Sequence, residues 1–218
     1  MTATGATSAA DVTLSAHGLQ CVRGGRTLIR GLDLTVEAGR PVHLLGVNGS
    51  GKTTLLRTLA SLRPPEAGEI HWCGHRLERV RSEFLQTMAY VGHAAGLKQD
   101  LTARENLAAH LALAGRQPVE SIPAALAAVG LRRLADRPVR RLSAGQARRV
   151  ALAGLRLTAA QLWILDEPFT ALDADGRELI RDLLIRHCTA SGLAILTSHQ
   201  PIDFGPLPVD EIRLGAES

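Results

Sequence analysis

The stretch Gly46-Val47-Asn48-Gly49-Ser50-Gly51-Lys52-Thr53-Thr54 decides the fold of this 218-residue chain, because it matches the phosphate-binding loop pattern G-x-x-x-x-G-K-[ST]. The short apolar run Val42-His43-Leu44-Leu45 before it predicts a buried strand. Residues 54–62 after it predict a helix whose leucines share one stripe, namely Leu55, Leu59 and Leu62. A strand, a glycine loop and a helix in this order indicate a nucleoside triphosphate site.

The residue types in this loop suit the binding of phosphate. Glycines let successive backbone N–H groups point into a concave anion site, to which the helix N-terminus adds positive potential. We expect the whole stretch to contact the nucleotide, that is Gly46, Val47, Asn48, Gly49, Ser50, Gly51, Lys52, Thr53 and Thr54. Lys52 is expected to reach the β- and γ-phosphates, and the Thr53 hydroxyl to ligate Mg²⁺.

Composition limits the class of protein. With 45% hydrophobic residues the chain can bury a large core in one domain or two tightly joined ones. Residues 1–10 do not resemble a secretory signal, and no stretch approaches the roughly 20 apolar residues of a membrane span, so we expect a cytoplasmic protein unless a partner recruits it. The three cysteines have no paired spacing, which favours reduced thiols.

The charge pattern does not favour nucleic acid as a partner. The net charge is +4, but the arginines are spread along the chain with only local pairs such as Arg148-Arg149. Aromatic residues make up 3% of the chain, which leaves few rings to stack on bases.

Coarse patterning predicts an α/β fold with three parts. Val12 to Leu34 and Glu69 to Arg76 predict strands of antiparallel character. Leu101 to Ala135 is rich in alanine and leucine and predicts a small helical insertion. The last third alternates between helices and strands, with a helix from Ala144, a strand over 162–165, a helix from about Asp175 and a strand over 194–197.

A second motif, Leu162-Trp163-Ile164-Leu165-Asp166-Glu167, places two carboxylates after an apolar strand. Alone it could be a buried strand that ends in surface acids. Together with the phosphate loop it has the Walker B arrangement, in which Asp166 holds Mg²⁺ through water and Glu167 polarises the water that attacks the γ-phosphate.

The third motif, Leu142-Ser143-Ala144-Gly145-Gln146, resembles the LSGGQ signature of ATP-binding-cassette (ABC) ATPases, with alanine at one glycine position. Ser143 and Gln146 also form an S-x-x-Q capping box, and the two roles are compatible. The resemblance implies that Ser143, Gly145 and Gln146 contact ATP held by the phosphate loop of a second copy, so that two cassettes enclose two nucleotides.

Other segments strengthen the resemblance, which covers about Val12 to Gln200. Ala171-Leu172-Asp173 resembles the D-loop, and Thr197-Ser198-His199 resembles the switch histidine segment, which implies nucleotide contacts for Asp173 and His199. Leu101 to Leu107 resembles the segment that faces a membrane subunit. The implied fold is a P-loop NTPase (RecA-like) core with an antiparallel β subdomain and a helical subdomain over about 93–145, in a single ABC ATPase domain over 11–218.

Two positions depart from the usual ABC pattern. His93 stands where the family commonly has a glutamine that contacts water and Mg²⁺, and histidine is shorter and titratable. No aromatic residue is available near Cys21-Val22-Arg23-Gly24 to stack on adenine, so the guanidinium plane of Arg23 is the candidate for this role.

These departures, with Gly92-His93, Arg148-Arg149, Leu162-Trp163 and His199-Gln200, make the chain similar to the haem-exporter ATPases of cytochrome c biogenesis. The resemblance implies ATP and Mg²⁺ as cofactors, transmembrane permease subunits and a second copy as partners, and a peripheral position on the cytoplasmic face of the inner membrane.

Three alternatives fit less well. Soluble ABC proteins of translation or DNA repair usually carry tandem cassettes or long insertions, and P-loop kinases or GTPases have no use for the segment 142–146. A binding module without turnover has no need of Glu167 and His199. The pair His71 and His75 with Cys73 could suggest a metal or haem site, but we expect this segment to be a β-hairpin strand, since no fourth ligand is suitably spaced.

Overall fold

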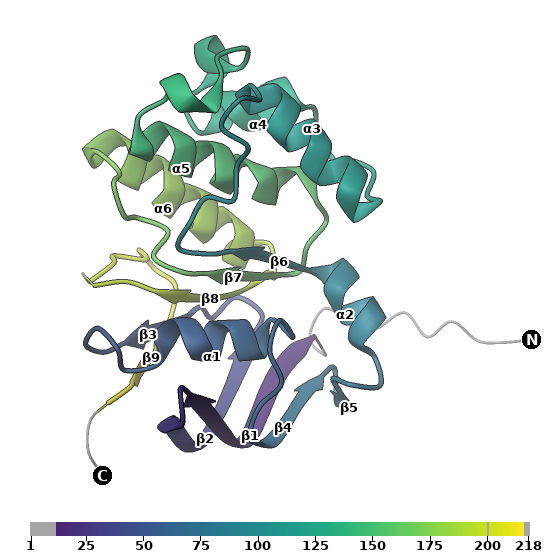
Figure 1. Ribbon diagram of the computed structural model, residues 1–218, viewed down its shortest axis with the longest axis vertical. Helices are drawn as coiled ribbons and strands as arrows, with labels where there is room; N and C mark the ends of the chain where they lie inside the picture. Colours follow the sequence, from purple (N-terminus) through teal and green to yellow (C-terminus); the bar gives the residue numbers. More distant parts are fainter. Residues whose placement is uncertain (1–11, 200, 216–218) are drawn as a thin grey trace, which may run out of the picture.

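The first part of the fold is an antiparallel sheet, seen at the bottom of Figure 1. The computed structural model describes residues 12–199 and 201–215, so the expectations on residues 1–10 and Gln200 lie outside the described residues. The sheet has the strand order β2-β1-β4-β5. Its strands are β1 (Thr13–Arg23), β2 (Arg26–Glu37), β4 (Ala67–Trp72) and β5 (His75–Arg76). This confirms the antiparallel character expected for the front of the chain.

The single strand expected over Glu69 to Arg76 is wrong. Cys73 and Gly74 both have left-handed backbone (φ 48° and 77°) and turn the chain back, so Trp72 pairs with His75 across a hairpin. Among the described residues, no group of three or more His, Cys, Asp or Glu side chains is arranged to hold a metal ion.

The second sheet is parallel and has the strand order β6-β7-β8-β3-β9. Its strands are β3 (Val42–Leu45), β6 (Met88–Val91), β7 (Leu162–Leu165), β8 (Leu193–Thr197) and β9 (Asp210–Arg213). Every residue of β7 and β8 is buried, because layers cover both faces of the sheet. Because both faces are buried, the sequences of these two strands are continuous apolar runs.

Helices and the antiparallel sheet cover the two faces (Figure 1). On one side lie α1 (Lys52–Leu59), the antiparallel sheet and α2 (Arg81–Thr87). On the other side lie α5 (Ala144–Ala153) and α6 (Ala174–Thr189). Further helices are stacked on α5, namely α3 (Ala103–Ala114), α4 (Ile122–Ala128) and the 3₁₀ turns η2 (Arg132–Leu134), η3 (Val139–Arg141) and η4 (Gly154–Leu157). The expected helical insertion between β6 and β7 is therefore present.

The hydrophobic core consists of two clusters, one on each face of the parallel sheet, and β7 contributes residues to both. Leu162 and Ile164 point into the cluster with α1 and the antiparallel sheet, whereas Trp163 and Leu165 point into the cluster with α5 and α6. Period-two alternation thus places one strand in both clusters. Within the described residues, no helix is both long and apolar enough to traverse a bilayer.

The helix after the phosphate loop is shorter than the expected 54–62. It begins at Lys52 and ends at Leu59, and Ser61 then adopts a left-handed conformation (φ 55°). Leu55 and Leu59 are fully buried as predicted, but Leu62 lies beyond the helix and is 54% exposed. The stripe therefore ends one turn earlier than the pattern indicated.

Candidate nucleotide site

The carboxyl ends of four parallel strands bring the sequence motifs together at one edge of the sheet. β3 leads into the phosphate loop, β6 into His93, β7 into Asp166 and β8 into the segment that ends at His199. A cleft of about 300 Å³ opens here. It is lined by Arg23, Leu28, Asn48, Gly49, Gly51, Lys52, Thr53, Thr54, His93, Asp166, Glu167, Thr170 and His199. A ligand site at this edge is the general expectation for an open α/β sheet.

The phosphate loop has the backbone that its glycines predict. Gly46, Gly49 and Gly51 have φ angles of 149°, 83° and 101°, values that side chains with a Cβ rarely adopt. The Lys52 ammonium lies across the loop and donates to the carbonyl oxygens of Gly46 (2.5 Å) and Val47 (3.1 Å). Asn48, Gly49 and residues 51–54 line the cleft, whereas Gly46, Val47 and Ser50 lie outside its lining.

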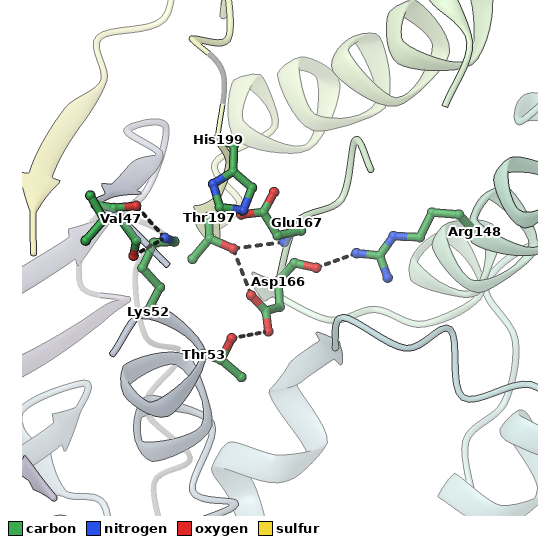
Figure 2. Close-up of polar contacts among 9 residues, drawn as sticks. Val47, Lys52, Thr53, Arg148, Asp166, Glu167, Thr197 and His199 are labelled. Carbon is green, nitrogen blue, oxygen red and sulfur yellow. Dashed lines mark hydrogen bonds and ion pairs between the residues drawn. The ribbon is translucent and has the colours of Figure 1, made fainter. Parts of the chain in front are cut away.

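A buried carboxylate connects the phosphate loop to the two central strands (Figure 2). Asp166 is 2% exposed and accepts a hydrogen bond at each oxygen, from Thr53 Oγ1 to Oδ2 (2.8 Å) and from Thr197 Oγ1 to Oδ1 (2.9 Å). Oxygen ligands of this kind suit a hard divalent cation. Thr53 and Asp166, the two predicted metal ligands, therefore lie side by side although 113 residues separate them.

Glu167 and His199 lie directly beside each other in the cleft, as Figure 2 shows. His199 Nε2 lies 3.2 Å from Glu167 Oε1. The geometry is not that of a hydrogen bond, so the buried Oε1 has no hydrogen-bond partner among the described residues. A carboxylate oxygen that is buried in a polar cleft without a hydrogen-bond partner is suited to accept a hydrogen bond from a water molecule or a substrate.

The signature residues lie elsewhere. Ser143, Gly145, Gln146 and Asp173 do not line this cleft in the described part of the chain. Ser143 and Gln146 form the expected capping box of α5, with Ser143 Oγ accepting from the Gln146 N–H (3.1 Å) and Gln146 Oε1 from the Ser143 N–H (3.0 Å). Asp173 caps α6 by accepting from the Gly176 N–H (2.9 Å). Within the chain, the side chains of Ser143, Gln146 and Asp173 thus serve as helix caps.

Comparisons with known proteins agree with this geometry. A family model described as "ABC transporter" matches residues 29–170. The chain is 49% identical over 194 residues to the cytochrome c biogenesis ATP-binding export protein CcmA of Methylococcus capsulatus, covering 88% of this chain and 94% of that protein. The chain belongs to the ABC transporter family and, within it, to the CcmA proteins.

Further relatives support the family and the fold. CcmA 1 of Salmonella paratyphi A is 49% identical over 200 residues, covering 92% of this chain and 94% of that protein. The solved structure of a putative ABC transporter ATP-binding protein from Pyrococcus furiosus superposes with a TM-score of 0.79 at 25% identity, covering 93% of this chain and 97% of that one. As a member of the ABC ATPases, the chain binds ATP and hydrolyses it.

The two departures from the usual ABC pattern both lie at the cleft. His93 and Arg23 are exposed and line it. Two further lining residues, Leu28 and Thr170, have no counterpart among the sequence predictions. Leu28 packs against the Gly51 backbone and adds an apolar surface beside Arg23, but an ordinary leucine in a strand carries no sequence signal for such a role.

Arg148 does not line the cleft, but it contacts the backbone of residues that do, and no such role was predicted for it from the sequence. It is only 5% exposed and extends from α5 to the edge of the sheet, where its Nη1 donates to the carbonyl oxygens of Gly92 (2.5 Å) and His93 (3.3 Å). Its Nη2 donates to the carbonyl oxygen of Asp166. Burial lowers the pKa of the Arg148 guanidinium, and the nearby Asp166 carboxylate opposes this effect.

Proposed function

We propose that the chain is the ATP-hydrolysing, energy-coupling subunit of an ABC transporter that serves cytochrome c biogenesis through haem delivery or export. The identity of 49% to a CcmA protein, over 94% of that protein's length, is the observation that carries this proposal. The cleft supports it, because Lys52, Asp166, Glu167 and His199 converge there as an ATPase requires.

The residues of the cleft fit ATP with Mg²⁺. Ser50 belongs to the phosphate loop although it does not line the cleft, and its buried hydroxyl has no hydrogen-bond partner among the described residues. The positive φ angles of the three loop glycines give the loop the curved backbone of a phosphate site. Thr53 would hold Mg²⁺ directly and Asp166 through water. The ion would neutralise charge that develops on the phosphates. Lys52 would exchange its two carbonyl acceptors for phosphate oxygens, which suits a flexible ammonium group.

Hydrolysis is assigned to Glu167 and His199. The Oε1 of Glu167, which has no hydrogen-bond partner among the described residues, orients the attacking water and accepts its proton. His199 is 53% exposed at its side chain and lies 3.2 Å from that oxygen, so it can turn a donor towards the γ-phosphate while it remains beside the base. Arg23 and Leu28 together form the candidate surface for the adenine ring.

A second copy of the chain is proposed to complete the site. Ser143, Gly145 and Gln146 lie at the N-terminus of α5 outside the cleft of their own chain, where a helix N-terminus and a serine hydroxyl suit a phosphate. The pair of cassettes would act on transmembrane permease subunits, which places the chain peripherally on the cytoplasmic face of the inner membrane. We also propose that 11–218 forms a single ABC ATPase domain with the helical subdomain at about 93–145.

Complementation tests this function directly. In a strain that lacks the gene, the wild-type chain is expected to restore c-type cytochromes, and the Glu167→Gln chain is expected to fail because it lacks the base. Both chains should be present at equal level by immunoblot. Normal cytochrome c levels in the deletion strain would reject the cytochrome c pathway, and full restoration by Glu167→Gln would reject the assigned base.

A further inference from the structure

The peptide group that joins Asp166 to Glu167 is hydrogen-bonded at both ends. Its carbonyl oxygen accepts from Arg148 Nη2, and its N–H donates to Thr197 Oγ1 at 2.9 Å. The two partners come from different elements, α5 and β8. The peptide plane is therefore fixed by side chains on opposite sides, both visible in Figure 2.

This peptide needs support because of the conformation that follows it. Glu167 has a φ of 55°, in the left-handed region, where a residue with a Cβ is less stable by about 1–2 kcal/mol. A strained backbone persists when its surroundings hold it, and such strain is concentrated at functional sites. In this backbone conformation, Oε1 of Glu167 lies 3.2 Å from His199 Nε2.

We propose that Arg148 is a positioning residue for hydrolysis: with Thr197 it clamps the Asp166–Glu167 peptide and thereby holds the Glu167 carboxylate in its working orientation. The inference rests on the proposed function, since it gives a role to the residue that supports the assigned base. Arg148 itself donates to main-chain oxygens and is not a catalytic residue.

Arg148 links α5 to two segments at the edge of the sheet, the Asp166–Glu167 peptide and the backbone of Gly92 and His93. The side chain starts on α5, five residues after Ser143, and the same guanidinium holds the carbonyl oxygens of Gly92 and His93. A guanidinium is planar and rigid, so its contacts cannot be adjusted independently. A displacement of α5 relative to the sheet therefore moves the Glu167 peptide and the His93 segment together.

Arg116 offers a matched control. It also donates from one guanidinium to two main-chain oxygens, those of Leu85 and Met88, and it also joins the helical part to the sheet. Neither arginine lines the nucleotide cleft. Arg148 nevertheless holds the carbonyl oxygen of the lining residue Asp166, whereas the two residues that accept from Arg116 are not lining residues. Replacing either arginine with methionine removes the hydrogen bonds while it retains much of the apolar stem.

The experiment compares Arg148→Met, Arg148→Lys and Arg116→Met in the full-length chain and in its membrane complex. Arg148→Met is expected to lower kcat for ATP by about tenfold to a hundredfold with KM changed less than about twofold, as a small misplacement of the base predicts. Arg148→Lys should recover part of kcat, since an ammonium can donate to one or two of the carbonyl oxygens. Arg116→Met should leave kcat within about twofold at equal folded fraction.

Amide hydrogen exchange provides a readout that does not depend on turnover. Arg148→Met should increase exchange at the Glu167 amide, and Arg116→Met should not. Wild-type kcat in folded Arg148→Met, an equal loss in Arg116→Met, or unchanged exchange at Glu167 would each overturn the clamp. Absence of ATP hydrolysis by the wild-type complex would instead reject the proposed function, and hydrogen exchange would still decide whether the clamp exists.

Discussion

The two small residues at the start of α5 differ in the space around them. Ala144 is exposed, whereas a Cβ added to Gly145 would overlap the carbonyl oxygen of Ala171. The family signature has glycine at both positions, and this chain keeps only the second. The structure explains the difference, because the close approach of the signature turn to the Ala171–Asp173 segment requires glycine at 145 alone.

Gly145→Ala should therefore separate these two segments. Overpacking against main chain typically costs about 1–3 kcal/mol, so we expect a lower melting temperature together with a loss of ATPase activity. Ala144→Ser is the matched control, since an exposed substitution usually stays within about 0.5 kcal/mol. Calorimetry and ATP turnover measure both effects. A Gly145→Ala chain as stable and active as wild type would contradict the close approach.

At the scale of elements, the helices α3 and α5 both begin with a capping box. Thr102 and Glu105 form a capping box at α3, and Ser143 and Gln146 form one at α5. Replacing either cap with alanine is expected to cost about 1 kcal/mol of unfolding free energy. Only Ser143→Ala should also lower ATP turnover, because only Ser143 is assigned to the nucleotide of a second copy.

The comparison of these two variants separates the structural role of Ser143 from its proposed ligand role. Unfolding by urea gives the stability, and steady-state hydrolysis gives the turnover. If Thr102→Ala and Ser143→Ala lose turnover equally, Ser143 acts as a helix cap alone.

The last turn of α6 contains a histidine that makes stability depend on pH. The His187 ring stacks on Trp163 with ring centroids 3.7 Å apart, and its Nε2 donates to the Leu193 carbonyl oxygen (3.0 Å). Burial lowers the pKa of His187 from its ordinary value of 6.5 to about 4. Between these values the unfolded chain binds more protons than the folded one, so stability falls as the pH is lowered through this range.

The contribution of His187 amounts to at most about 3 kcal/mol, lost between pH 6.5 and 4. His187→Phe retains an aromatic ring beside Trp163 and has no proton to bind. We expect the unfolding free energy of the His187→Phe chain to rise less steeply with pH than that of the wild type. The difference in slope corresponds to at most one bound proton. Urea titrations at several pH values measure the slope, and identical slopes in both chains would contradict the lowered pKa.

How far the sequence predicts these elements depends on their surroundings. β7 and β8 are buried on both faces, so their apolar runs were recognised. β9 is an edge strand that contains Asp210, Glu211 and Arg213, a pattern that does not indicate a strand, and it was missed. Lys52, Thr53, Asp166, Glu167 and His199 were predicted from their motifs and lie together at the cleft, whereas the signature residues were predicted but lie outside it. Arg148 entered only through the Arg148-Arg149 pair, with no role predicted for it. Its partners are main-chain oxygens, which have no identity in a sequence.

At the scale of the whole molecule, the residues expected to bind the phosphates of ATP and the signature residues lie in different places. The phosphate loop, Asp166 and Glu167 line one cleft, and Ser143 lies outside it at the N-terminus of α5. On the proposed function, each chain contributes one half of each of two composite sites. ATP is expected to bring two chains together, and hydrolysis to release them, which is the motion that a permease partner could use.

The state of association of the Glu167→Gln chain tests this claim most directly. Without the base, bound ATP should persist and hold two chains together, so light scattering after gel filtration should report twice the monomer mass with ATP and Mg²⁺ and the monomer mass with ADP. Adding Ser143→Arg to this chain should restore the monomer in ATP. A Glu167→Gln chain that binds ATP and remains a monomer, or that hydrolyses ATP at the wild-type rate, would contradict the shared site.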